Sequence, residues 1–142
     1  MPQTPQIDCY LFFDGTCAEA MRFYASVVGG EMETMMTGAD APASEEMPAE
    51  ARDQILHASL LLGDRRLMAS DWMAPSPYPG MHGFAVPLGY RTVAEARRIF
   101  DQLSAGGSVT MPFEKTFWAE GFGMLVDRFG TPWMVSGALA AE

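Results

Sequence analysis

The sequence predicts an α+β protein built from two tandem βαβββ modules, and three observations support this. A helix-start signal occurs twice, as Thr16-Cys17-Ala18-Glu19 and as Thr92-Val93-Ala94-Glu95, a little over half the chain apart. In both, Thr followed three residues later by Glu is the pattern of a capping box. Each signal follows an apolar run, and each helix pattern ends at a double glycine before another strand-like segment. The segment 60–70 also resembles 124–136, so the chain reads as a duplicated unit.

The first module, about residues 6–72, contains one helix and four strands. An apolar stripe at helical spacing predicts the helix, which the pair Gly29-Gly30 ends. The pair Gly63-Asp64 is a turn signal between the last two strands. Residues 38–53 are rich in Ala, Pro and Glu without periodicity, which predicts a long exposed loop. The predicted elements are strand 7–13, helix 17–28, and strands 31–37, 54–62 and 66–71.

The second module, about residues 82–138, follows a linker at 72–81 that holds three prolines and a glycine. Pro87 inside the first strand indicates a sheet edge or a bulge. The motif Asp127-Arg128-Phe129-Gly130 is typical of a tight turn, in which Asp opens the turn and Gly takes a positive φ. The predicted elements are strand 83–88, helix 93–104, and strands 108–111, 116–122, 123–127 and 133–136.

Composition excludes several classes of protein. The chain has 142 residues, 49% of them apolar and 19% charged, which is typical of a folded domain rather than a disordered one. Its net charge of −9 disfavours nucleic acid and anionic membrane surfaces as partners. No apolar run approaches the roughly 20 residues that cross a bilayer. The first five residues lack a secretion signal, and the two cysteines form no disulfide framework. We therefore expect a cytoplasmic protein.

Each module would have a helix on one side of a small sheet, which leaves the other sheet face uncovered. Two such sheets can curl toward each other and enclose a cavity. The concave face is then the place to look for a ligand.

One long segment of the second module reads Glu114-Lys115-Thr116-Phe117-Trp118-Ala119-Glu120-Gly121-Phe122-Gly123-Met124-Leu125-Val126-Asp127-Arg128-Phe129-Gly130-Thr131-Pro132-Trp133-Met134. This segment resembles the PhnB-like family. That family belongs to the vicinal oxygen chelate superfamily of glyoxalases, bleomycin-resistance proteins and extradiol dioxygenases. The resemblance implies tandem βαβββ modules, a cup-shaped mixed sheet and a homodimer. Some members carry a methyltransferase label, but this chain lacks the Gly-rich strand-to-helix turn that S-adenosylmethionine would need. Further segments that fit the family are Tyr10-Leu11-Phe12-Phe13, Phe23-Tyr24 and His57-Ala58.

The resemblance also implies a divalent metal, held by His, Gln or Glu from four strands and acting as a Lewis acid on a chelating substrate. Carried onto this sequence, the four ligand positions fall at Cys9, Ser59, Gly83 and Met134, with His82 one residue from the third. None of the four is an expected ligand type. We therefore expect no metal and no cofactor. The alternative is a metal-dependent lyase, isomerase or dioxygenase whose ligands lie elsewhere.

No catalytic residue stands out, but several side chains are candidates to line the cup. His57 either exchanges a proton with a ligand or bonds to a neighbouring carbonyl. Trp118 either stacks on a ligand or belongs to a core or dimer interface. Cys9 is either a nucleophile or an inert buried thiol. The full set of candidate ligand-binding residues is Cys9, His57, Ser59, Trp118, Phe122 and Met134.

The sequence thus predicts a homodimer that binds a small organic molecule in a metal-free, largely apolar cup. Kinship with bleomycin-resistance proteins implies that this fold can act as a binder alone. The chain's many methionines, Met68, Met124 and Met134 among them, either form an adaptable cavity wall or fill the core. In the second case side chains fill the cup, and the dimer interface rather than a ligand site is the functional feature.

Overall fold

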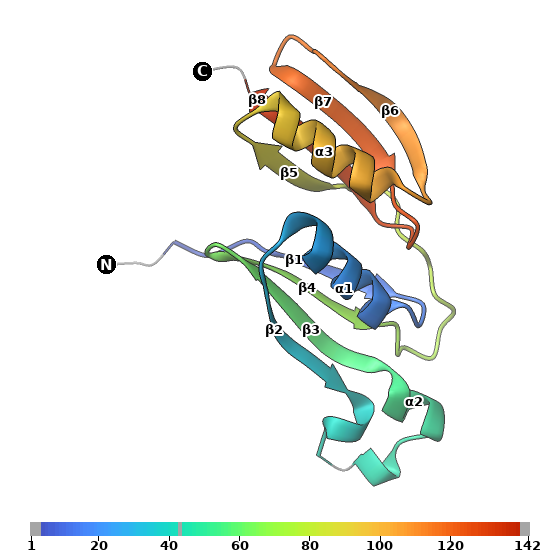
Figure 1. Cartoon of the computed structure of the whole chain (residues 1–142). Helices are drawn as coiled ribbons and strands as arrows, with labels where there is room; N and C mark the ends of the chain where they lie inside the picture. Colours follow the sequence, from blue (N-terminus) through green and yellow to red (C-terminus); the bar gives the residue numbers. More distant parts are fainter. Residues whose placement is uncertain (1–3, 43, 140–142) are drawn as a thin grey trace. The chain divides into compact units, whose positions relative to one another are not determined.

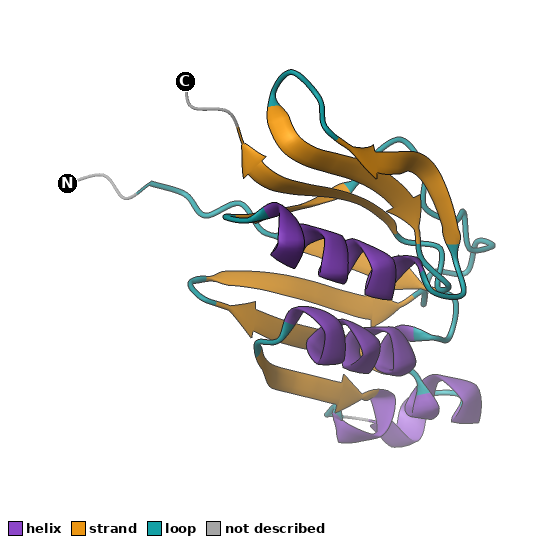
Figure 2. Cartoon of the chain, turned by 45° about the horizontal axis from the view of Figure 1, so that its top comes forward, coloured by secondary structure: helices purple, strands orange, loops and turns teal. Residues whose placement is uncertain are grey.

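The computed structural model describes residues 4–42 and 44–139 (Figure 1). The chain divides into two compact units, Met1–Pro79 (unit 1) and Gly80–Glu142 (unit 2). Each unit contains one long helix that lies across one face of its own sheet (Figure 2). None of the described helices is long and apolar enough to span a membrane.

Unit 1 is a four-stranded sheet with one packed helix and an insertion. Its sheet order is β1-β4-β3-β2, in which β1 is parallel to β4 and the other pairs are antiparallel. Its main elements are β1 (Cys9–Phe13), α1 (Cys17–Val28), β2 (Glu31–Thr37), β3 (Ile55–Leu62) and β4 (Arg65–Asp71).

Unit 2 repeats this topology within the described residues. Its order is β5-β8-β7-β6, with β5 parallel to β8 and the other pairs antiparallel. The prediction of an α+β fold with two βαβββ modules is therefore confirmed. Its elements are β5 (Val86–Tyr90), α3 (Val93–Ser104), β6 (Ser108–Glu114), β7 (Ala119–Val126) and β8 (Pro132–Leu139).

The segment between β2 and β3, which the sequence predicts as a long exposed loop, is mostly exposed and includes short helical turns. It contains two short 3-10 helices, η1 (Gly38–Asp40) and η2 (Ser44–Glu46), and the short helix α2 (Ala49–Asp53). Hydrogen bonds within the insertion hold these turns, since the Arg52 Nη2 donates to the Glu45 carbonyl at 2.9 Å. The Gly38 amide donates to the Gln54 carbonyl at 3.0 Å, which closes the insertion at its base. In unit 2 only residues 115–118, all of them described, separate β6 from β7.

The strand β7 is continuous, whereas the sequence predicts two strands that meet at Phe122-Gly123. Gly121 and Gly123 lie inside the strand, where the absence of a side chain leaves room for aromatic rings that pack against it. A Cβ on Gly121 would lie 2.5 Å from the Phe113 ring, and one on Gly123 would lie 2.6 Å from the Phe100 ring. The reversal comes earlier, where the Thr116 amide donates to the Ala119 carbonyl at 3.0 Å.

The two helices begin with different caps, although their sequences look alike. Thr92 caps α3, since its Oγ1 accepts from the Glu95 amide at 3.2 Å, which is the threonine half of the predicted capping box. The Thr16 side chain makes no capping bond, so the capping box predicted there is wrong. Asp71 supplies the acceptor instead, because its buried Oδ1 accepts from the Cys17 amide at 3.0 Å. A residue at the end of β4 thus caps α1.

The core of each unit lies between its helix and its sheet. Successive strand residues point to opposite faces, so every second residue of the central strands is buried under the helix. The fully or nearly fully buried apolar residues include Leu11, Phe13, Met21, Tyr24 and Leu60 in unit 1, and Ile99, Leu103, Leu125, Trp133 and Val135 in unit 2.

Candidate functional site

The sheet face of unit 1 that points away from α1, here called open face 1, carries exposed aromatic rings. In β1, Leu11 and Phe13 are buried on the α1 side, at 2% and 0% exposure. Tyr10 and Phe12 alternate with them and are 40% and 44% exposed. The strand therefore presents two aromatic side chains on the face that no helix of this unit covers.

The strand β3 contributes His57 and Ser59 to open face 1. Ala58 and Leu60 are fully buried on the α1 side of this strand, so the residues that alternate with Ala58 point the other way. The register pairs Met68 with Tyr10 on one side and with Ser59 on the other. Residues of β1, β4 and β3 thus form one row across the face.

Tyr10 and His57 contact each other directly. The Tyr10 Oη lies 3.0 Å from the His57 Nδ1, within hydrogen-bond distance, and the two rings stack with centroids 5.7 Å apart. Phe12 extends the group, with its ring centroid 5.2 Å from that of Tyr10 and 5.7 Å from that of Trp72. The Tyr78 hydroxyl donates to the Phe12 carbonyl at 2.7 Å. We call Tyr10, Phe12, His57, Trp72 and Tyr78 the open-face aromatic cluster.

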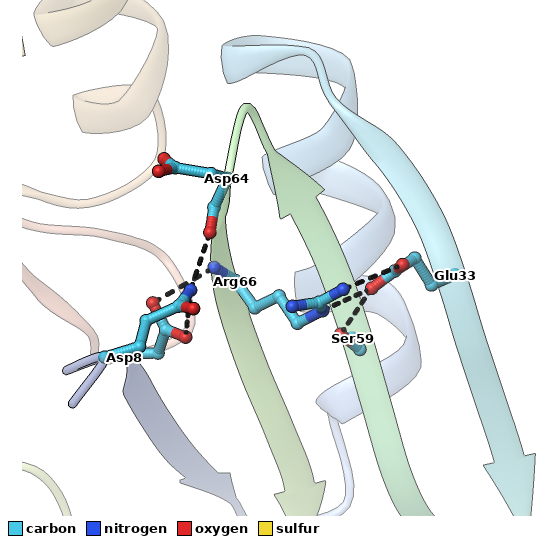
Figure 3. A network of polar contacts seen from close by, with 6 residues as sticks. Asp8, Glu33, Ser59, Asp64 and Arg66 are labelled. Carbon is cyan, nitrogen blue, oxygen red and sulfur yellow. Dashed lines mark hydrogen bonds and ion pairs between the residues drawn. The ribbon is translucent and has the colours of Figure 1, made fainter. Parts of the chain in front are cut away.

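Ser59 belongs to a polar network on the same face (Figure 3). Its hydroxyl donates to the Glu33 Oε1 at 3.3 Å. Figure 3 shows the Arg66 side chain extending from β4 across β3, where its Nε donates to the same oxygen at 2.7 Å. The hydrogen bond from Arg66 is the main reason that the pKa of Glu33 lies below its usual value. The positive charge of Arg66 is thus paired within the protein.

Cys9 does not lie on open face 1, contrary to the prediction. It lies on the same side of β1 as Leu11 and Phe13, which are buried under α1. Burial, with the Asp8 charge second, raises the pKa of its thiol. A raised pKa lowers the thiolate fraction, which makes Cys9 a poor nucleophile.

Unit 2 has an equivalent open face, here called open face 2, away from α3. Trp133 and Val135 are buried on the α3 side of β8, so Met134 points the other way. The register pairs Met124 with Met134, and the Trp118 ring centroid lies 5.2 Å from that of Phe122. The structure thus places the three candidates of this unit, Trp118, Phe122 and Met134, on or beside one apolar face.

The four positions carried over for a metal do not fit a divalent ion. The Ser59 hydroxyl is bonded to Glu33, Met134 offers only a thioether, and Cys9 lies on the helix side of its sheet. Gly83 lies outside β5, which begins at Val86 rather than at residue 83 as predicted. Across residues 4–42 and 44–139, no group of three or more His, Cys, Asp or Glu side chains is arranged to hold a metal. That the protein works without a metal stays a prediction.

Comparison with known proteins places this arrangement in a family. The family model of the glyoxalase, bleomycin resistance protein and dioxygenase superfamily matches residues 6–135. The chain belongs to this superfamily. The protein YjdN of Escherichia coli (strain K12) is 35% identical over 144 residues, which cover 96% of this chain and 95% of YjdN.

Two solved structures are similar in fold to this chain. The crystal structure of protein PA1353 from Pseudomonas aeruginosa is 45% identical, with a TM-score of 0.87 over 94% of this chain and 98% of that one. The PhnB protein from Bacillus cereus is 24% identical, with a TM-score of 0.76 over 94% of this chain and 100% of that one. This last match shows the fold alone.

Sequence reasoning missed Tyr10, Glu33 and Arg66. Nothing in the sequence signalled Tyr10, because both sides of the apolar run from Ile7 to Phe13 carry apolar side chains. Glu33 had no signal either, since the register between β2 and β3 shifts between Met32 and Thr34 and leaves Glu33 at the irregularity.

Proposed function

We propose that this superfamily member binds a small organic molecule against its open sheet faces, without a metal, as a cytoplasmic homodimer. The observation that carries the proposal is the exposure of Tyr10 and Phe12, 40% and 44%, on a sheet face that the described helices of unit 1 leave uncovered. Contiguous exposed apolar surface on a folded protein commonly marks a site of interaction. The aromatic and methionine side chains of open face 2 support the same proposal for unit 2.

The character of the two faces favours a mainly apolar ligand. Open face 2 offers Trp118, which is 37% exposed, and the half-buried Met134, whereas Phe122, which contacts Trp118, is buried at 8% exposure. Methionine adapts to ligands of varied shape. On open face 1 the charges of Glu33 and Arg66 are paired with each other. A ligand with few charged groups therefore suits both faces.

A neutral fluorescent probe, N-phenyl-1-naphthylamine, tests the proposal, since its emission rises in apolar sites. The wild-type protein should enhance the emission, and Phe12→Ala should weaken the enhancement. Ile7→Ala is the matched control, because Ile7 is 86% exposed and precedes β1. No enhancement with the wild type, or equal effects of the two variants, would refute binding on open face 1.

Two further measurements address the rest of the proposal. Light scattering after size exclusion should give about twice the 15.5 kDa mass of the chain. Elemental analysis of the purified protein should find no stoichiometric Ni, Zn, Fe or Mn. A stoichiometric metal would support the alternative, a metal-dependent lyase, isomerase or dioxygenase.

A further inference from the structure

We propose that unit 1 recognises a small organic cation, whose methylated ammonium group lies against the rings of Phe12, Trp72 and Tyr78. We call these three rings the aromatic corner. The inference rests on the proposed function, and it adds the chemical class of the ligand and the residues that select it.

The rings of the aromatic corner meet at steep angles. The Trp72 ring centroid lies 5.7 Å from that of Phe12 and 6.2 Å from that of Tyr78, with interplanar angles of 89° and 72°. At such spacings one cation can lie within about 6 Å of two ring centroids, the range over which an aromatic face attracts positive charge. Phe12 is 44% exposed, and Trp72 and Tyr78 are half-buried, so ring surface is open to a ligand.

Hydrogen bonds hold the aromatic corner in place before a ligand arrives. The Trp72 Nε1 donates to the Ser76 carbonyl at 2.8 Å, and the Tyr78 hydroxyl donates to the Phe12 carbonyl at 2.7 Å. Two prolines between Trp72 and Tyr78 restrict the backbone that carries the rings. Because the side chains are already oriented, a ligand has little ordering to impose on them when it binds.

The same hydrogen bonds determine which kind of cation fits. The Trp72 indole has only a donor, which Ser76 already accepts, and Phe12 has no polar side-chain atom. The three rings therefore offer one acceptor at most, the Tyr78 oxygen. A primary ammonium has three N–H donors that need acceptors, whereas a quaternary ammonium has none and is bound by aromatic faces alone.

The charge of unit 1 also favours a cation. Residues 1–79 contain twelve Asp and Glu against four Arg, so unit 1 carries −8 of the chain's net charge of −9. The Arg66 guanidinium is paired with Glu33 at 2.7 Å. Burial, with the charge of Asp14 second, raises the pKa of Tyr78, so a carboxylate acts on the aromatic corner itself. Surroundings of one charge sign raise the local concentration of ligands of the opposite sign.

Choline and 3,3-dimethyl-1-butanol test the inference, because they have the same shape and differ in that carbon replaces the charged nitrogen. Isothermal titration calorimetry gives both dissociation constants for each protein. The wild type should bind choline about three- to thirtyfold more tightly than the alcohol, the factor typical of a cation on aromatic faces. Phe12→Leu and Trp72→Leu keep an apolar side chain but remove a π face, so each should bring this ratio closer to unity.

Phe117→Leu is the matched control, because it removes a ring of unit 2 that is 92% exposed. It should keep the wild-type ratio. All three variants keep the net charge, so a general attraction of cations to the acidic protein would leave every ratio alike. Far-UV circular dichroism checks that each variant folds, and the comparison of the two probes on the wild type needs no variant.

The outcomes separate the inference from the proposed function. Equal binding of both probes by the wild type would overturn the inference, and so would a preference for choline that neither Phe12→Leu nor Trp72→Leu reduces. Vesicles of phosphatidylcholine display the same methylated group on a surface and should not compete with choline. Competition by the vesicles would overturn the assignment to a small molecule.

Binding of neither probe would also overturn the inference. Enhanced emission of N-phenyl-1-naphthylamine would in that case leave the proposed function standing. A negative result with this neutral probe as well would remove the proposed binding function itself.

Discussion

The change Asp127→Asn tests the physical account of the turn that joins β7 to β8. Asp127 is 4% exposed, and its Oδ1 accepts from the Phe129 amide at 2.8 Å and from the Thr131 amide at 3.0 Å. Its Oδ2 accepts from the Trp133 Nε1 at 2.8 Å, so one carboxylate holds both the turn and a buried tryptophan. Asparagine can keep the acceptor at Oδ1, but its amide nitrogen cannot accept from the indole.

The magnitude follows from these contacts. A hydrogen bond to a charged group contributes about 1.5–3 kcal/mol, and a buried donor that loses its acceptor costs about 1–3 kcal/mol. These two contributions overlap for Trp133, and the two remaining bonds weaken when the acceptor becomes neutral. We therefore expect Asp127→Asn to lower the free energy of unfolding by about 2–4 kcal/mol, a large part of the 5–15 kcal/mol typical of a domain.

Urea denaturation followed by far-UV circular dichroism measures this change, with tryptophan fluorescence as a second probe of the same transition. The control is Asp101→Asn, which removes the same charge from an exposed position on α3. It should change the free energy of unfolding by less than about 0.5 kcal/mol. A loss below about 1 kcal/mol for Asp127→Asn would refute the reasoning that the carboxylate holds this turn.

Three more predictions follow from the packing and the pKa values. Burial, with the charge of a neighbouring aspartate second, raises the pKa of the Cys17 thiol to about 12, so iodoacetamide should modify native Cys17 far more slowly than Cys9 by mass spectrometry. Equal rates would contradict this. In Gly137→Ala the new Cβ would lie 2.8 Å from atoms of α3, which should cost about 1–3 kcal/mol of unfolding free energy, whereas Gly89→Ala, with its nearest neighbour at 3.8 Å, should cost little. A tolerated Gly137→Ala would show that α3 can shift. The lowered pKa of Glu33 means that its ion pair stabilises the fold above the unfolded-state pKa and that this contribution is lost as the pH falls through the folded-state pKa. Glu33→Gln should therefore flatten the acid limb of a pH–stability curve, and an unchanged limb would contradict the assignment.

The candidate site was only partly predictable, and the reason differs from residue to residue. His57 and Ser59 are two residues apart in the predicted strand 54–62, so strand alternation predicts that they share a face, and the structure places both on open face 1. Cys9 was expected on the concave face because a metal position of the family was carried onto it, and this carry-over put it on the wrong side of β1 and left Tyr10 out. Which residues of the edge strand β1 point toward the open face depends on which of them the helix covers. The apolar run from Ile7 to Phe13 does not reveal this, because both sides of the strand carry apolar side chains.

By itself the sequence determined the duplicated order of helices and strands, including helices at 17–28 and 93–104 that the structure reproduces. Periodicity and glycine stops are local, so neighbours along the chain suffice to encode them. Only the tertiary structure decided that Asp71 caps α1 and that Tyr10 meets a histidine 47 residues away. Such contacts arise from strand register and from the side of the sheet that the helix covers, and these are set when the whole unit packs.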